Sequence, residues 1–398
     1  MYESKLNNSE RFPYIAALDL GTSKILAMVA QKTPEGILVL DSKQISSGIC
    51  IRRGCIYKID DAANAVRIVV NDLNSSLNQI LERIYVGIGG QSLKTVHCSV
   101  KKEVNGLVSY DMLLSIEKKY SDDKLLNLVE VLEIVSTEYY LDDKLETDPE
   151  GMYCKELEVK YQLIVGSPSL KNFLKKSIEE KANLKIAGFF ISPLATAEAV
   201  LTNKDKKNGC ALVEFGAGVT YLSIYKNNRL KYLVTIPLGG DVITKDICCL
   251  NILKLEAESL KISDGNALIG NDEEEQLLDT IIGARASEIV ANISAQINES
   301  GYSSDLKEGI VTTGGASLLR NLDKLLSQQT GKQVRQSNKN PEYACILGML
   351  TLGKSNCIRW KSNEQLKEEY GKKEKRNISI QKRKESLFGK LSRTIFDD

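Results

Sequence analysis

The sequence predicts an α/β protein with a duplicated, two-lobed fold. The first observation is an internal repeat: LDLGTSKILAMV, which starts at Leu18, matches the pattern of VEFGAGVTYLSI, which starts at Val213 about half a chain later. The second is that β-type apolar runs alternate with segments of helical periodicity. The third is composition, because 42% hydrophobic and 26% charged residues in a chain of 398 residues are typical of a globular protein of two or three domains.

The first lobe is expected to begin at residue 12. Two apolar runs, YIAALDL and KILAMVA, flank a turn that contains Gly21, and this pattern indicates a hairpin. GILVL predicts a third strand, and apolar residues at helical spacing predict a helix over residues 60–81. This first part of the lobe extends to residue 83.

A change of pattern at Ile84 indicates an inserted α+β subdomain over residues 84–166. IYVGIGG and TVHCSV predict strands, polar stretches with helical periodicity follow, and LEVKYQLIVG predicts another strand. The first lobe then resumes over residues 167–203 with a helix, a strand and a second helix. That second helix is expected to begin near Pro193, because proline is tolerated in the first turn of a helix.

The second lobe is expected over residues 204–340, and its first residues, 204–209, are predicted to be a polar break. VEFGAGVTYLSI and RLKYLVTI predict three consecutive strands, and helical segments at about 240–300 form an outer subdomain. GIVTTGGASLL predicts a strand, a glycine turn and a helix that starts near Ala316. A helix and a strand over residues 341–362 close the folded core, and the remainder divides into a charged linker, 363–383, and a final helix, 384–398.

The two glycine turns could bind phosphate groups. A glycine in a hairpin turn lets backbone N–H groups approach a phosphate with no Cβ in the way. In the first turn, Thr22 and Ser23 add hydroxyl groups, Lys24 adds a positive charge, and Asp19 could hold Mg²⁺ through water. One such hairpin is a common turn, but two that face each other could hold a polyphosphate and a metal ion between them.

A third glycine motif, TTGGAS, strengthens this interpretation. Gly314 and Gly315 would let a flat base or sugar approach the backbone, and the N-terminal end of a helix near Ala316 would favour negative charge. By themselves, the two glycines are equally consistent with a tight connection between a strand and a helix.

The order of these motifs resembles the ATPase superfamily of actin, sugar kinases and heat-shock chaperones. Within it, the inserted segment, IPLGGDVITKDI, EAESLK, ARASEI and the tail resemble the bacterial cell-division family FtsA over essentially the whole chain. The resemblance implies an actin-like, duplicated ATPase fold that binds ATP with Mg²⁺. It also implies a protein that forms homopolymers, recruits other division proteins to the septum and tethers FtsZ to the cytoplasmic face of the cell membrane.

The site residues implied by the resemblance are those that match the motifs of the family. Asp19 and Glu214 are the candidate metal residues, through water, and no catalytic residue is assigned. Without the resemblance, Glu258 and Lys261 would be interpreted as an i,i+3 surface pair. The C-terminal peptide of FtsZ would be received around residues 285–309. The candidate nucleotide-binding residues are Asp19, Gly21, Thr22, Ser23, Lys24, Glu214, Gly216, Ala217, Gly218, Glu258, Lys261, Gly314, Gly315 and Ala316.

The second glycine turn departs from the superfamily pattern. Many relatives have Asp-x-Gly-Gly-Gly-Thr followed by another Asp, whereas this chain has Glu214, Ala217, Val219 and Tyr221. Val219 has no side-chain donor and Tyr221 has no carboxylate, so contacts with phosphate and metal should be poorer there. We therefore expect ATP binding with slow or absent hydrolysis.

The tail differs in charge from the rest of the chain. Residues 371–393 include nine basic and two acidic residues, so this stretch has a net charge of +7 and the rest of the chain has a net charge of −6. That acidic remainder offers no basic face for nucleic acid. KESLFGKLSRTIF predicts an amphipathic helix that binds an anionic membrane surface, and docking on the protein's own body or on a partner is the alternative. The candidate membrane-binding residues are Leu387, Phe388, Leu391, Ile395, Phe396, Lys390 and Arg393.

Other classes fit less well. Nine scattered cysteines without a CxxC pair indicate neither a zinc site nor a disulfide framework, and one histidine, His97, makes a Ser-His-Asp triad improbable. The polar first residues and the lack of a run of about 20 apolar residues predict a cytoplasmic, peripheral protein. Two alternatives remain: a small-molecule kinase of the same superfamily, and a scaffold similar to the actin-like pilus-assembly protein PilM.

Overall fold

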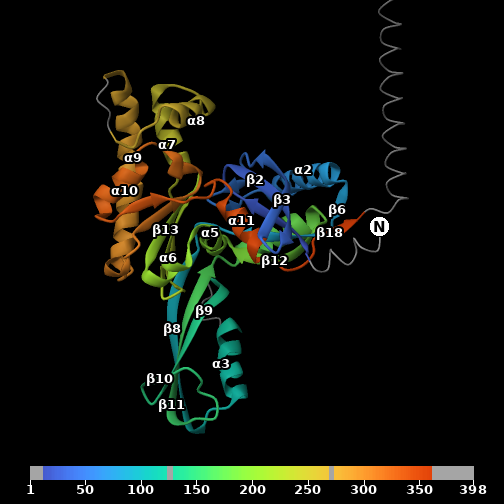
Figure 1. Ribbon diagram of the computed structural model, residues 1–398, viewed down its shortest axis with the longest axis vertical. Coiled ribbons are helices and arrows are strands. Elements are labelled where there is room, and N and C mark those ends of the chain that lie inside the picture. Colours follow the sequence, from blue (N-terminus) through green and yellow to red (C-terminus); the bar gives the residue numbers. More distant parts are fainter. Residues whose placement is uncertain (1–11, 123–128, 269–272, 361–398) are drawn as a thin grey trace, which may run out of the picture.

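The computed structural model describes residues 12–122, 129–268 and 273–360. Within these residues, the chain forms two lobes and a third unit that projects from them (Figure 1). The linker and the amphipathic helix predicted over residues 363–398 lie outside the described residues. So do all the candidate membrane-binding residues, which are Leu387, Phe388, Lys390, Leu391, Arg393, Ile395 and Phe396.

The two lobes contain sheets with the same strand order. In the first lobe, the order is β12-β7-β1-β2-β3; in the second, it is β17-β16-β13-β14-β15. In both, the first strand of the lobe pairs antiparallel with the second and parallel with a later strand. The duplication predicted from the repeat is therefore confirmed. The first sheet consists of β1 (Tyr14–Leu20), β2 (Lys24–Thr33), β3 (Gly36–Ser46), β7 (Arg83–Ile88) and β12 (Lys185–Ile191). The second consists of β13 (Cys210–Phe215), β14 (Thr220–Lys226), β15 (Arg229–Ile236), β16 (Ile310–Thr313) and β17 (Val334–Gln336).

Helices cover both sheets, and some begin or end elsewhere than predicted. The residues predicted as a polar break form α6, because Thr202 and Asp205 make a capping box. The prediction of a helix that starts near Ala316 is wrong. Gly315–Leu318 is a single 3₁₀ turn, and α10 begins at Leu322. The helices of the lobes are α2 (Ile59–Leu77), α4 (Ser169–Lys175), α5 (Ser192–Val200), α6 (Asn203–Asn208), α7 (Gly240–Ile247), α8 (Lys254–Ser263), α9 (Glu273–Glu299), α10 (Leu322–Thr330) and α11 (Ala344–Leu352). Short strands are β4 (Ile51–Arg52), β5 (Cys55–Ile56), β6 (Gln79–Leu81) and β18 (Ile358–Trp360).

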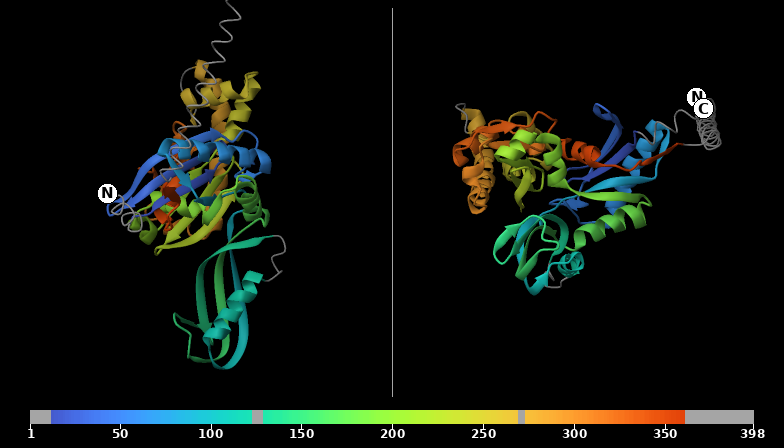
Figure 2. Two further views of the ribbon diagram at one scale, coloured as in Figure 1. Left: turned by 90° about the vertical axis from the view of Figure 1, so that its right-hand side faces the viewer. Right: turned by 60° about the horizontal axis from the view of Figure 1, so that its bottom comes forward.

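Residues 94–166 form the projecting part, here called the inserted unit. It contains α3 (Tyr110–Asp122) beside a sheet of β8 (Lys94–Leu107), β9 (Glu130–Leu141), β10 (Lys144–Glu146) and β11 (Tyr153–Gly166). Figures 1 and 2 show it extending away from the lobes. The inserted unit follows β7 of the first lobe in the chain, but its strand β8 pairs with β15 of the second lobe. One nine-stranded sheet therefore runs from the second lobe into the inserted unit.

The lobes meet where α5 crosses α11. Pro193 lies in the first turn of α5, as predicted from its tolerance there. The crossing is close, since a Cβ added to Gly348 would lie 1.7 Å from the backbone oxygen of Ala195. One cluster of buried apolar side chains fills the first lobe and extends to second-lobe residues such as Leu212 and Leu233, a second cluster lies within the second lobe, and a third lies within the inserted unit. Among the described helices, none is long and apolar enough to cross a membrane.

Candidate functional site

The two glycine turns of the repeat have the same backbone geometry. The N–H of Gly21 donates to the carbonyl oxygen of Lys24 at 3.0 Å, and the N–H of Gly216 donates to the carbonyl oxygen of Val219 at 2.9 Å. Each glycine is needed, because an added Cβ would lie 3.0 Å or less from that same carbonyl oxygen. The repeated sequence pattern therefore produces a repeated tight turn between two antiparallel strands.

The two turns face each other across the junction of the lobes. A Cβ added to Gly218 would lie 2.6 Å from the hydroxyl oxygen of Thr22, so the backbone of the second turn touches the first turn. The same hydroxyl oxygen accepts a hydrogen bond from the N–H of Gly54 at 3.0 Å. Thr22 is thus already held by the protein, whereas Ser23 is exposed.

Asp19 and Glu214 are the next-to-last residues of β1 and β13, the strands that lead into these turns. Burial raises the pKa of Asp19 to about 6, although the positive charge of Lys24 and a hydrogen bond with Cys345 oppose this. Burial raises the pKa of Glu214 to about 8, a hydrogen bond with Thr196 opposes the rise, and the charge of Asp19 adds to it. Each carboxylate is therefore poorly solvated in its charged form.

These two carboxylates fit the binding of a hydrated divalent cation. The Oε2 atom of Glu214 is buried and has no hydrogen-bond partner in the described part of the chain. A buried, unsatisfied carboxylate oxygen beside a second carboxylate is costly unless a cation or a proton compensates it. Mg²⁺ prefers oxygen ligands and keeps several waters, which suits two carboxylates on facing turns. Three or more metal-binding side chains do not gather anywhere in the described residues.

The N-terminal end of α7 packs against the second turn. The N–H groups of Gly240 and Asp241 donate to the carbonyl oxygens of Gly216 and Ala217 at 2.9 and 2.8 Å. A Cβ at Gly239 would lie 2.5 Å from the oxygen of Gly216, so only glycine fits here. The stretch IPLGGD therefore belongs to the site, although its glycines were not among the predicted site residues.

Glu258 and Lys261 on α8 lie at this same place. The Nζ atom of Lys261 is 2.7 Å from Oε2 of Glu258, 2.8 Å from the hydroxyl of Thr244 and 3.2 Å from the backbone oxygen of Gly240. Burial works against ionisation of Glu258, but its hydrogen bonds with Lys261 and Thr244 hold its pKa below the ordinary value. The pair is thus more than an exposed i,i+3 contact, because it is anchored on α7.

The third motif, TTGGAS, completes the group of predicted site residues. This group, here called the ring, consists of the two glycine turns, Glu258, Lys261 and the third motif. The Cβ atom of Ala316 would lie 3.1 Å from a Cβ added to Gly240, so TTGGAS approaches α7 next to Lys261. The hydroxyl groups of Thr313 and Ser317 are buried without a partner in the part of the chain that the structure describes. Unsatisfied hydroxyl groups of this kind are uncommon in native proteins and suit a polar ligand.

The two glycines of this motif have different surroundings. Gly314 has a φ of +86°, and an added Cβ would lie 2.3 Å from the backbone oxygen of Phe215, so the fold itself requires this glycine. Gly315 is exposed, and its nearest neighbour would be Cγ of Glu342 at 3.9 Å. The open approach predicted for both glycines therefore exists only at Gly315.

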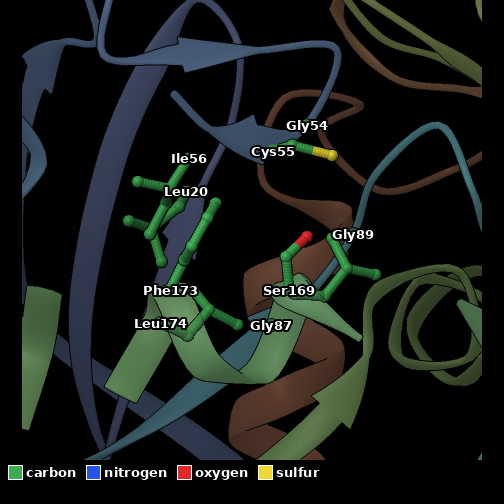
Figure 3. Close-up of a pocket in the computed structure, with 10 residues that line it drawn as sticks. Leu20, Gly54, Cys55, Ile56, Gly87, Gly89, Ser169, Phe173 and Leu174 are labelled. Atoms are coloured by element: carbon green, nitrogen blue, oxygen red, sulfur yellow. The ribbon is translucent and has the colours of Figure 1, made fainter. Parts of the chain in front are cut away.

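A separate small cavity lies beside Leu20, the residue that precedes the first turn (Figure 3). Its volume is about 50 Å³, and Leu20, Ile56 and Phe173 lie together on one side of it. Ligand sites for molecules of nucleotide size need several hundred Å³. This mostly apolar cavity is therefore distinct from the ring of site residues described above.

Comparisons with known proteins bear on the identity of the chain. The family described as "Cell division protein FtsA" matches residues 211–348. FtsA of Porphyromonas gingivalis is 30% identical in an alignment of 355 positions that covers 83% of this chain and 74% of that protein. The chain belongs to the FtsA family. FtsA of Bacillus subtilis is 26% identical over 87% of this chain and 84% of its own length. This chain is a cell-division protein of this family.

Solved structures agree with the predicted fold of this FtsA. A "PilM-PilN type IV pilus biogenesis complex" has a TM-score of 0.62 at 14% identity, covering 84% of this chain and 97% of that one. MreB5 of Spiroplasma citri bound to ADP has a TM-score of 0.53 at 13% identity, covering 85% and 95%. At these identities, the similarity concerns the fold alone, and it confirms the actin-like, two-lobed α/β architecture.

Proposed function

We propose that this FtsA binds ATP with Mg²⁺ between its two glycine turns. The observation that carries the proposal is the convergence of the three motifs, which are about 100 to 200 residues apart in sequence, on one ring around Gly218 and Gly240. The fold is also that of an MreB whose structure holds ADP.

Each part of the ring would have its own task. The backbone of the two turns would hold the phosphate groups, and Asp19 and Glu214 would hold Mg²⁺ through water. Lys261 and Glu258 would contact the nucleoside, and Gly315 would allow the nucleoside to lie against the backbone. Mg²⁺ would neutralise phosphate charge. Since Val219 offers no side-chain donor and Tyr221 no carboxylate, we propose that hydrolysis is slow or absent.

Calorimetry with Mg²⁺ and a non-hydrolysable ATP analogue tests this proposal. Lys261→Ala should weaken binding, because it removes an ammonium group that faces α7 and the third motif. Lys245→Ala on α7 is the matched control, and it should leave the affinity unchanged. Equal affinity for all three proteins, or no heat in the parent, would contradict the site.

We further propose that this FtsA polymerises and tethers FtsZ to the cytoplasmic face of the membrane at the septum. Membership of the FtsA family supports the division role. The amphipathic pattern of residues 384–396 supports membrane attachment, and several helices in one polymer would bind a membrane more strongly than one helix. The inserted unit and residues 285–309 are the proposed surfaces for assembly and for the FtsZ peptide.

A pull-down with the C-terminal peptide of FtsZ tests the tethering role directly. The peptide should retain the full-length FtsA, and a scrambled peptide of the same composition should not. Retention by both peptides would indicate non-specific capture, and retention by neither would contradict the partner. Sedimentation with and without ATP tests polymerisation in the same preparation.

A further inference from the structure

The hydroxyl of Tyr221 joins the second glycine turn to the base of the inserted unit. Its oxygen accepts a hydrogen bond from the backbone N–H of Gly90 at 2.6 Å. Tyr221 lies on β14, directly opposite Glu214 in the hairpin that contains the second turn. Gly90 lies between β7 and β8, four residues before the inserted unit begins. One hydrogen bond therefore links a strand of the candidate nucleotide site to the start of the inserted unit.

The glycines around this hydroxyl leave it almost no freedom. A Cβ added to Gly89 would lie 2.7 Å from the Tyr221 oxygen, and one added to Gly54 would lie 3.2 Å from it. Tyr221 itself is 7% exposed. A side chain larger than hydrogen at either glycine would displace the phenol. The backbone around Tyr221 is thus shaped to receive the ring and its hydroxyl.

The same contacts reach the first glycine turn. Gly54 donates its N–H to the hydroxyl oxygen of Thr22 at 3.0 Å, and a Cβ at Gly54 would lie 3.0 Å from the backbone of Gly90. Thr22, Gly54, Gly90 and Tyr221 therefore form an unbroken series of contacts from one turn to the other. Any ligand that changes the separation of the two turns must act on this series.

The inserted unit and the segment directly before it are attached to the second lobe at three further points. The hydroxyl of Thr235 lies 2.9 Å from the backbone oxygen of Leu93 and 3.2 Å from that of Gly90. The backbone N–H of Leu233 donates to the hydroxyl oxygen of Thr95 at 3.0 Å. The side chain of Gln162, which is buried, donates to the backbone oxygen of Lys231 at 2.7 Å. All of these partners in the second lobe belong to β15, the neighbour of β14.

We propose that Tyr221 is a positioning residue that makes the inserted unit follow the second glycine turn, so that ligand binding at the turns changes the placement of the inserted unit. The inserted unit belongs to the first lobe in chain order, but its hydrogen bonds attach it to the second lobe. Movement of the lobes about the crossing of α5 and α11 would then carry the inserted unit with β14 and β15. This role gives a physical reason for a tyrosine at position 221, where many relatives have a carboxylate, because the phenol hydroxyl reaches the N–H of Gly90.

Hydrogen exchange measured by mass spectrometry on the full-length protein tests this proposal. Without ligand, Tyr221→Phe should make exchange at residues 89–98 about two- to tenfold faster, since it removes one hydrogen bond and keeps the ring. Residues 139–146, at the end of the inserted unit that lies away from Lys94, should be unaffected. Tyr232→Phe is the matched control, because it removes a tyrosine hydrogen bond on β15 to Gln296, inside the second lobe.

The second arm uses ATP with Mg²⁺ as the probe, and it rests on the proposed function. In the parent, ATP should slow exchange both at residues 20–26, the first turn, and at residues 89–98. In Tyr221→Phe, the change at 20–26 should remain and the change at 89–98 should be lost. An equal change at 89–98 in parent and variant would overturn the proposal.

The two proposals fail in different ways. If ATP altered neither segment in the parent, the nucleotide site would be refuted, and with it the transmission of ligand binding to the inserted unit. If Tyr221→Phe left the ligand-free exchange of residues 89–98 unchanged, the anchoring role of Tyr221 would be refuted even where ATP binds. A Tyr232→Phe protein that behaved like Tyr221→Phe would also overturn it, by showing a general loss of packing.

Discussion

The ammonium group of Lys24 lies 2.7 Å from the carboxylate of Glu342, at the edge of the first glycine turn. The same ammonium group lies 4.9 Å from the centre of the Tyr343 ring. Lys24 follows the turn directly, as its motif predicts, but its charge is compensated by a residue more than 300 positions away. A phosphate group at the turn would therefore compete with Glu342 for Lys24.

This competition predicts the effect of Glu342→Gln. The variant keeps the size of the side chain and removes its charge, so ATP should bind about two- to fivefold more tightly, in line with the modest strength of a partly exposed ion pair. Lys24→Ala should weaken binding. Calorimetry at low ionic strength measures both, and an unchanged affinity for Glu342→Gln would show that Lys24 does not reach the ligand.

The different surroundings of Gly314 and Gly315 make a second prediction. Gly315→Leu should leave the midpoint of urea unfolding unchanged and prevent ATP binding, because its side chain would enter open space where the nucleoside is expected. Gly314→Ala should unfold at lower urea concentration, since its Cβ meets the backbone of Phe215. Gly106→Leu, which lies in the inserted unit, is the control. ATP binding to Gly315→Leu with parental affinity would place the nucleoside elsewhere.

The buried carboxylate of Glu214 predicts a pH dependence of stability. Its pKa is about 8 in the folded protein and about 4.5 when solvated. The native state therefore binds more protons than the unfolded state between these values, and the free energy of unfolding should fall as pH rises from about 4.5 to 8. Asp19 acts in the same direction, with a pKa of about 6.

The substitution Glu214→Gln isolates this contribution. Relative to the parent, Glu214→Gln should gain stability steadily between pH 5 and pH 8.5, because the amide never becomes charged. Urea unfolding without divalent cations measures the difference at each pH. Adding Mg²⁺ at pH 8.5 should stabilise the parent more than the variant. A difference that does not vary with pH would contradict the assignment of this titration to Glu214.

The crossing of α5 and α11 predicts a strong effect of one methyl group. Gly348→Ala places a Cβ 1.7 Å from the backbone oxygen of Ala195, so the helices must separate. We expect a loss of at least about 1–3 kcal/mol in the free energy of unfolding. Thr351→Ala, at an exposed position of α11, should change it by less than about 0.5 kcal/mol. Equal unfolding midpoints for Gly348→Ala and the parent would refute this crossing.

The tail supplies a prediction that depends on sequence alone. Leu391→Glu places a charge on the apolar stripe, whereas Ser386→Glu places the same charge on the opposite side of the predicted helix. Leu391→Glu should release the protein from anionic liposomes even at low salt. Ser386→Glu should weaken binding only slightly, and more at low salt than at high salt. Equal sedimentation of both variants with liposomes would favour docking of this helix on protein.

The sequence by itself determined the features that depend on neighbouring residues. The tight turns at Gly21 and Gly216, their flanking strands and the start of α5 at Pro193 follow from local backbone preferences, and the repeat of the first two features indicated the duplication. Even so, local signals missed α6 and misplaced the helix expected near Ala316. TTGGAS ends in a 3₁₀ turn over Gly315–Leu318, directly after Gly314 packs against the backbone of Phe215, and α10 begins only at Leu322.

The tertiary structure alone decided which side chains of the site are available to a ligand. Lys24 is paired with Glu342, Thr22 already accepts the N–H of Gly54, and the phenol of Tyr221 is committed to Gly90. These partners are 32 to 318 positions apart in the sequence. Hydrophobic periodicity and turn chemistry act over a few residues, whereas these contacts arise only after two lobes and an inserted unit have packed together. For that reason, the residue types of the site could be predicted from the sequence, but their pairing could not.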